Sequence, residues 1–319
     1  MLKYKIYLKL LFLVIMSIFG TALLYLYIFS KTYPLPMLNR VSLDAKIKFI
    51  KDNIDINTVD TIIVGSSIGL NDIQGAALEK SSTKCKSVLN LSGFELRAAQ
   101  VEQILELITV FPNLQRVVYS AQFSDFSESA TLEDYDSSLI KRYLTNTLSY
   151  EDNIFILLHS YKNIIACIQR HWDWKKKYMS NNKFTYLGFD HTGSVPLHIY
   201  GKDIIKSRWD KPHTEKQDKS SYSTLEKIVK KLKKDNIDFY FVMEPYRAAL
   251  IKEFKHVHPT MLTFEDTIKK ILLSNSGTFL NLHNKLHLSD DYFADRSHLN
   301  DKGSAITAEA IGLFIDENE

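Results

Sequence analysis

Apolar segments of strand length alternate with amphipathic segments of helix length along most of this chain. Five strands are predicted, at residues 61–65, 87–93, 114–123, 237–245 and 277–283. Apolar positions at helical spacing predict four helices, at residues 43–54, 95–111, 222–236 and 302–317. Apolar strands alternating with such helices are typical of an α/β protein. We therefore predict a parallel sheet of about five strands with helices on both faces, in three layers.

The N-terminal segment has a different pattern. Residues 10–29 carry no charge and are mostly apolar, and about 20 such residues are long enough to cross a bilayer. The apolar run continues past the small residues 20–22, which favours an uncleaved signal anchor over a cleaved signal peptide. Because Lys3, Lys5 and Lys9 precede the run, we expect the basic stub at 1–9 to be cytoplasmic and the rest of the chain to be periplasmic or extracellular.

Two further regions complete the predicted organisation. Residues 30–58 are expected to form a tether and one short helix, and residues 59–319 the α/β domain, with a long insertion at 123–220.

A composition of 45% hydrophobic and 24% charged residues is typical of a folded protein, and a net charge of +3 gives no reason to expect nucleic-acid binding. Cys85 and Cys167 are the only cysteines, and they form either a disulfide or two buried thiols. The histidine spacing gives no argument for a metal site, and no cofactor is required.

Two short motifs carry candidate chemistry. The first predicted strand runs into Gly65, Ser66 and Ser67, at the sheet edge where parallel α/β proteins bind ligands. This stretch is either a simple turn or a strand-to-helix turn that presents a nucleophilic serine. The second motif is Asp295 with His298, before the last helix, where a carboxylate three residues from an imidazole can orient it.

Taken together, these motifs resemble the SGNH (GDSL-like) hydrolase superfamily. The resemblance rests on "GSSI" at 65–68, on Gly93 after the second strand, and on Asp-x-x-His at 295–298 followed by "LNDKG". It implies a flavodoxin-like sheet and a catalytic triad of Ser67, His298 and Asp295. It also implies an oxyanion hole formed by the N–H groups of Ser67 and Gly93.

The chain departs from the family in the third motif. The family has Gly-x-Asn after the third strand, with the asparagine side chain as a further oxyanion donor. This chain has "SAQFSDF" there, and Gln122 is the nearest substitute, with an amide on a longer side chain. Losing one such donor typically costs about 3 kcal/mol of transition-state stabilisation. A slower enzyme and an inactive one are both compatible with this departure.

Membrane-anchored members with serine in the second position of the first motif are similar to proteins that work beside membrane-bound O-acyltransferases, in teichoic-acid D-alanylation and alginate O-acetylation. Residues 241–250 resemble the segment after the fourth strand in such proteins. The resemblance implies serine-dependent transfer of an acyl group, with acetyl as the expected group, to or from a cell-envelope polysaccharide, with an O-acyltransferase as partner. The alternative is an inactive SGNH-like scaffold or a glycan-binding protein.

Two further sets of residues are candidates for substrate binding. Glu244 and Arg247 flank Pro245 at a strand end, where they either line the site or form a local ion pair. Trp172 and Trp174 lie in an aromatic and basic stretch at 169–189. Such a stretch suits a groove for a sugar polymer, a lid packed on the domain, or a patch lying on lipid headgroups.

Overall fold

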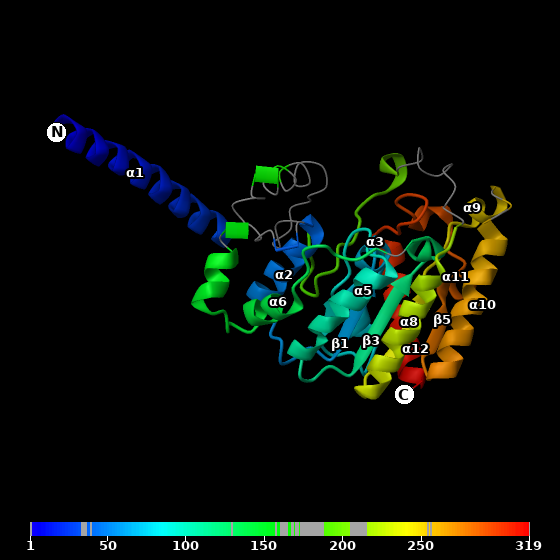
Figure 1. The fold of residues 1–319 in the computed structure, drawn as a ribbon. Helices are drawn as coiled ribbons and strands as arrows, with labels where there is room; N and C mark the ends of the chain where they lie inside the picture. Colours follow the sequence, from blue (N-terminus) through cyan, green and yellow to red (C-terminus); the bar gives the residue numbers. More distant parts are fainter. Residues whose placement is uncertain are drawn as a thin grey trace.

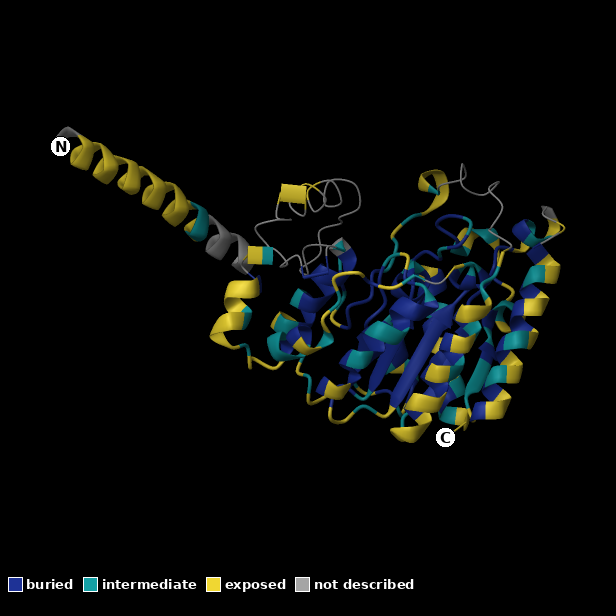
Figure 2. Cartoon of the chain, in the orientation of Figure 1, coloured by how far each residue is buried: buried dark blue, intermediate teal, exposed yellow. Residues whose placement is uncertain are grey.

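The computed structural model describes residues 2–32, 37–38, 40–128, 130–156, 188–204, 216–253 and 257–318, together with residues 158, 159, 165, 166, 169, 172 and 255. Helix α1 (Leu2–Thr32) extends away from the body of the protein (Figure 1). Its side chains from Tyr4 to Leu24 form an apolar span of 21 residues with a mean hydropathy of 2.2, none of it buried (Figure 2). This helix is long and apolar enough to cross a membrane, and its apolar span begins earlier than the predicted residues 10–29.

The body is built on a sheet of five parallel strands. They are β1 (Thr61–Gly65), β2 (Val88–Asn90), β3 (Arg116–Ala121), β4 (Asp238–Met243) and β5 (Thr278–Asn281). The strand order is β2-β1-β3-β4-β5, and every neighbouring pair is parallel, which confirms the predicted α/β sheet. Because the order reverses direction at β1, the carboxyl ends of β1 and β3 flank a topological switch point, where ligands bind in open α/β sheets.

Helices pack against both faces of the sheet. Successive residues of a strand point to opposite faces, so Ile62 and Val64 belong to one apolar cluster while Ile63 belongs to another. The first cluster packs against α5 (Ala98–Ile104), α8 (Lys219–Lys234) and α10 (Val257–Asn275). The second packs against α4 (Gly75–Ser81), α11 (Leu282–Leu286) and α12 (Asp301–Asn318). This burial on both faces explains why the strands read as continuous apolar runs.

Helix α2 (Val41–Asn53) connects the anchor region to the body. Its apolar residues Leu43, Ile47 and Ile50 are buried in the same cluster as β1, so this helix is part of the main core. Lys46, on the same helix, is also buried. It donates hydrogen bonds to the carbonyl oxygens of Asn90 and Gly193, which attaches α2 to the end of β2. Helix α6 (Ser137–Leu144) packs beside α2 (Figure 1).

Several elements differ from the predictions. The helix expected at 95–111 begins at Ala98 and changes at residue 105 into a 3₁₀ helix, η1 (Leu105–Val110). Helix α3 (Ser67–Asp72) follows β1, as the strand-to-helix interpretation of the serine turn expects. Helices α9 (Ala248–Glu253) and α10 were not predicted, nor were α4, α6 and α11. The short 3₁₀ elements are η2 (Phe123–Phe126), η3 (Gly201–Asp203) and η5 (Asp290–Tyr292). Strand β2 is also shorter than the predicted segment 87–93.

Candidate active site

The two adjacent serines after β1 have different roles. Ser66 is buried and caps α3, because its hydroxyl accepts the backbone N–H of Ile68. Ser67 is the first residue of α3 and is partly exposed. The turn is tight because β1 and β3 lie close together: a Cβ atom on Gly65 would fall 2.3 Å from the carbonyl oxygen of Ser120. The sequence therefore places a hydroxyl at the carboxyl edge of the sheet on a short, constrained turn.

A chain of hydrogen bonds joins Ser67, His298 and Asp295. The Nε2 atom of His298 lies 2.8 Å from Ser67 Oγ, across 231 positions of sequence. The Nδ1 atom lies 3.0 Å from each carboxylate oxygen of Asp295. A proton on Nδ1 is donated to Asp295, which leaves the Nε2 lone pair free to accept the proton of the serine hydroxyl. The two sequence motifs predicted to meet at this edge do meet there.

Asp295 is held as a carboxylate. Burial opposes its charge, but the neighbouring His298 and the backbone N–H groups of Ser297 and His298, each 2.9 Å from Oδ1, together lower the pKa of Asp295. A lowered pKa contributes stability above the unfolded value of about 3.9, and this contribution is lost as the pH falls toward the folded value. Asp295 thus stays charged at neutral pH, as an orienting carboxylate requires.

The oxyanion donors are not placed as predicted. The backbone N–H of Gly93 donates to the carbonyl oxygen of Gly65 at 3.2 Å, because the backbone pairing of β1 and β2 continues past the last residue of β2. The side-chain amide of Gln122 is fully buried and donates to the carbonyl oxygen of Pro245 at 2.9 Å. Both donors are therefore already used, and the expectation that they face an oxyanion is not met in this structure. The N–H of Ser67 is in the first turn of α3 and has no acceptor within the helix.

Two buried carboxyl groups beside the triad were missed by the sequence analysis. Asp72, the last residue of α3, accepts the backbone N–H of Leu299 at 2.9 Å. Burial, followed by the nearby carboxyl group of Glu244, raises the pKa of Asp72 well above its usual value. Asp125 accepts the backbone N–H of Gln122 at 2.9 Å, and burial raises its pKa as well. In the sequence each acid stands between a polar and an apolar residue, in Asn71-Asp72-Ile73 and Ser124-Asp125-Phe126, and this pattern is too common to identify them.

Glu244 and Arg247, the two candidate residues after the end of β4, have different partners. Glu244 is buried and accepts a hydrogen bond from Ser120 Oγ at 2.9 Å. Burial raises the pKa of Glu244 to about 8, although the Ser120 bond works in the opposite direction. Arg247 is also buried, and its Nη1 atom lies 3.1 Å from the carboxylate of Asp290. Glu244 is thus a candidate for a neutral buried acid behind the site.

The remaining candidates lie elsewhere or outside the described residues. Trp172 is 55% exposed, and Trp174 lies outside the described residues. Cys85 is buried with a free thiol. Cys167, like Trp174, lies outside the described residues. Within the part of the chain that the structure describes, no group of three or more His, Cys, Asp or Glu side chains is arranged to hold a metal ion.

No protein-family model and no curated protein matches this chain. Its function is therefore argued from the geometry of the site. A partly exposed hydroxyl, an imidazole within hydrogen-bond reach of it and a carboxylate that fixes the imidazole are the components of serine nucleophilic catalysis. This arrangement can hydrolyse an ester, or transfer its acyl group to another hydroxyl, without a metal.

Proposed function

We propose that this chain is a membrane-anchored, serine-dependent enzyme that removes an acyl group from an ester or transfers it to a second hydroxyl. The observation that carries the proposal is the hydrogen-bond chain from Ser67 Oγ through His298 to Asp295, at 2.8 and 3.0 Å. This hydrogen-bond chain joins a serine at the start of α3 to a histidine 231 residues away in the sequence. Such a contact is the geometry expected of a nucleophile and its general base.

The reaction follows from the roles of the three side chains. As Ser67 Oγ attacks the carbonyl carbon, His298 Nε2 takes the hydroxyl proton and a tetrahedral oxyanion forms. Collapse of this intermediate breaks the ester C–O bond, and His298 returns the proton to the departing alkoxide. The acyl-serine is then attacked by water or by a sugar hydroxyl, which gives its proton to His298. The bond between the acyl carbon and Ser67 Oγ breaks, and His298 returns the proton to Oγ. The products are a free acid or a new ester, together with regenerated Ser67.

The resemblance to membrane-anchored SGNH proteins supports a more specific form of the proposal. In this form the body lies outside the cytoplasm on the α1 anchor, takes the family's SGNH and flavodoxin-like architecture, and acts on an O-acetylated cell-envelope polysaccharide beside a membrane-bound O-acyltransferase. The 2-1-3-4-5 strand order and the candidate membrane span of Tyr4–Leu24 are consistent with it.

A covalent probe tests the proposed nucleophile directly. A fluorophosphonate loses fluoride when an activated serine forms a P–O bond with it, so intact mass and peptide mapping report whether Ser67 is modified. The full chain in detergent should react once, at Ser67, and Ser67→Ala should not react. Ser223→Ala, which removes an exposed hydroxyl on α8, is the matched control and should react like the natural chain.

Acceptor chemistry needs a second measurement. A null strain should be complemented with either the natural gene or the Ser67→Ala variant, and the ester content of the envelope glycans measured by mass spectrometry. Opposite changes distinguish the two reactions: a transferase null loses glycan acyl groups, whereas an esterase null gains them. If the Ser67→Ala variant restores the natural acyl content, the enzymatic proposal is wrong.

A second candidate function rests on the occupied oxyanion donors. Because Gly93 N–H and the Gln122 amide are bonded to Gly65 and Pro245, the site lacks two of the three donors expected from the resemblance. This observation favours a non-catalytic scaffold or glycan-binding protein. Absence of fluorophosphonate labelling, combined with glycan binding that is the same in the natural chain and in Ser67→Ala, would support this candidate over the enzyme.

A further inference from the structure

The helical segment around residues 150–159 has two unlike faces. Residues 150–156, 158 and 159 are helical. The inward face carries Ile156, which is 7% exposed, and Asp152, whose carboxylate pairs with Arg142 at 2.7 Å. His159 lies on the same side and lines a cavity with Ile156. This side of the segment is therefore fixed to the body.

The outward face is mostly apolar. At 100° per residue, Tyr150, Ile154 and Leu158 lie within 80° of one another on the helix, and Phe155 lies a further 60° round. They are 78%, 41%, 67% and 56% exposed, respectively. The exposed Glu151 is the one charged residue within this arc. A helix on a protein surface normally turns its polar side outward, and a contiguous exposed apolar surface marks an interaction site. We refer to these four residues as the apolar arc.

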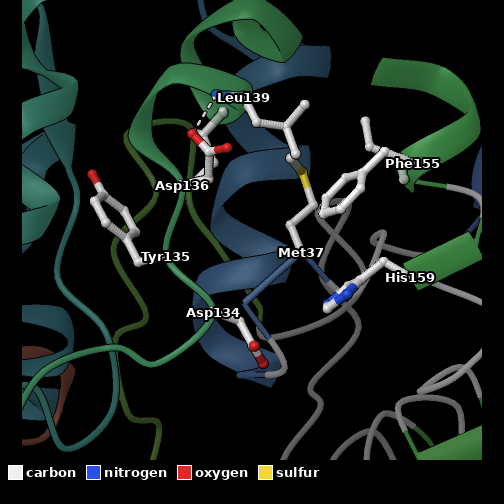
Figure 3. A pocket seen from close by; sticks show the side chains of 9 residues that line it. Met37, Asp134, Tyr135, Asp136, Leu139, Phe155 and His159 are labelled. Atoms are coloured by element: carbon white, nitrogen blue, oxygen red, sulfur yellow. Dashed lines mark hydrogen bonds between the residues drawn. The ribbon is translucent and has the colours of Figure 1, made fainter. Parts of the chain in front are cut away.

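The apolar arc is close to the membrane anchor. A cavity of about 260 Å³ is lined by Met37, Leu139, Phe155 and His159 among others, and Figure 3 shows the side chains of Met37, Leu139 and Phe155 turned toward one another around it. Met37 follows Thr32, the last residue of α1, by five residues, which span at most about 18 Å. The helical residues between Leu24 and Thr32 add about 12 Å.

Chain length thus keeps the segment that carries the apolar arc close to the bilayer. Met37 can lie no further than about 30 Å from the end of the apolar span. Figure 1 shows the same proximity, with the green helical segment that follows α6 beside the base of α1. Ile165 and Trp172, further along, are also exposed. Among the described residues beyond α1, the other exposed large apolar side chains lie well apart from one another: they are Tyr200, then Leu262 and Leu273, which are eleven residues apart on α10, and Leu313 on α12.

We propose that the apolar arc lies on the lipid bilayer, with its side chains at the boundary between headgroups and acyl chains. Interfacial helices bind in this way, with the apolar face buried about 5–10 Å into that boundary. The arc adds a second membrane contact to the anchor and fixes the orientation of the body on the surface. This contact is independent of the chemistry proposed for Ser67.

Lipid-borne quenchers test the contact in the full-length chain. Cys85→Ala and Cys167→Ser remove the natural thiols, and bimane is attached at Leu158→Cys in vesicles of phosphatidylcholine and phosphatidylglycerol. Leu273→Cys is the matched control, because Leu273 is 84% exposed on α10, far from the anchor (Figure 1). Lipids with a nitroxide near the headgroup should quench label 158 at least threefold more than label 273. Aqueous iodide should show the reverse order.

Two outcomes would overturn the proposal. Equal quenching of the two labels by lipid nitroxides would mean that the arc faces water. Protection of label 158 from both quenchers would mean that a protein, either another copy or a different chain, covers the arc. Both substituted side chains are exposed, and a circular dichroism spectrum identical to that of the natural chain confirms that each labelled protein is folded. The result does not depend on whether Ser67 is reactive.

Discussion

The carboxyl oxygen Oδ1 of Asp72 accepts the backbone N–H of Leu299 at 2.9 Å. Asp72 ends the helix that Ser67 begins, and Leu299 directly follows His298. This one bond therefore connects the element that carries the candidate nucleophile to the loop that carries its base. Thr307 on α12 also donates its hydroxyl to the carbonyl oxygen of Asp72, which strengthens the connection.

The first prediction concerns Asp72. Burial raises its pKa well above the usual value and so disfavours the charged form, and asparagine keeps the shape and the Oδ1 acceptor of the neutral acid. Asp72→Asn should keep labelling of Ser67 within about threefold. Asp72→Leu leaves the N–H of Leu299 without its acceptor and should cost about 1–3 kcal/mol of unfolding free energy. Urea denaturation and fluorophosphonate labelling measure the two effects.

If Asp72 has only a structural role, the expected result is different. If Asp72→Leu lowers stability while the labelling rate of the folded protein, and its pH profile, stay unchanged, then Asp72 does not position the triad. Restoration of the natural profile by Asp72→Asn identifies the acceptor oxygen as the part that matters.

The second prediction concerns Asp295. Asparagine in its place presents an amide that no longer holds the Nδ1 proton of His298, so the useful tautomer is lost. Asp295→Asn should slow labelling of Ser67, or hydrolysis of an activated acetyl ester, by about 10³- to 10⁴-fold. Asp291→Asn, an exposed carboxylate four positions earlier, is the control and should have little effect. A loss smaller than about tenfold would argue against the triad.

The third prediction uses the raised pKa of Glu244, which is about 8. Between the unfolded value of about 4.3 and the folded value, the unfolded chain releases a proton that the folded chain retains. Stability from this group is fully present below about pH 4.3, declines by up to about 1.4 kcal/mol per pH unit, and is lost once the pH passes 8.

Glu244→Gln removes the titratable carboxyl group but keeps an oxygen that can accept the hydrogen bond from Ser120 Oγ. The variant should gain stability relative to the natural chain as the pH rises from 5 to 8, in urea unfolding at several pH values. Glu309→Gln on α12, an exposed acid, is the control. Parallel pH curves for the natural chain and Glu244→Gln would show that Glu244 is ionised in the folded state.

The fourth prediction concerns Lys46. Its ammonium group donates to the carbonyl oxygens of Asn90 and Gly193 and lies 4.5 Å from the ring centre of Phe189. Lys46→Met leaves two buried carbonyl groups without that donor and should reduce the free energy of unfolding by about 1–3 kcal/mol. The same substitution at Lys48, on the same helix, removes only an ion pair with Asp52 and should cost less than about 1 kcal/mol. Equal costs would contradict the structural role of Lys46.

The sheet and the triad could be predicted from sequence for different reasons. Residues 61–65 read as a buried strand because three β-branched residues in succession have few alternatives. Ser67, Asp295 and His298 could be identified because the two motifs together resemble the SGNH pattern, although each motif alone is common in turns and loops. Their meeting at 2.8 and 3.0 Å is a property of the folded chain that spacing alone does not provide.

The oxyanion donors were not predictable in the same way. Whether Gly93 donates to a ligand or to Gly65 depends on how far the β1–β2 pairing extends, which is decided by tertiary packing. The longer side chain of Gln122 reaches Pro245, a contact between the segments that follow β3 and β4, which are far apart in sequence. Helix α3 was expected only from its place after the serine turn, because its six residues, buried on nearly every side, show no amphipathic period.

The close approach of β1 and β3 at Gly65 has a consequence for how this protein can change. Because the backbone of Ser120 leaves no space for a side chain at position 65, the position of the Ser67 hydroxyl is fixed relative to the sheet itself. The segment between β3 and β4 is tied to the same turn, because the N–H of Val195 donates to the carbonyl oxygen of Leu70 in α3 at 2.9 Å. A change in the length of this segment would therefore have to keep residues near 195 in place for the hydroxyl to stay where it is.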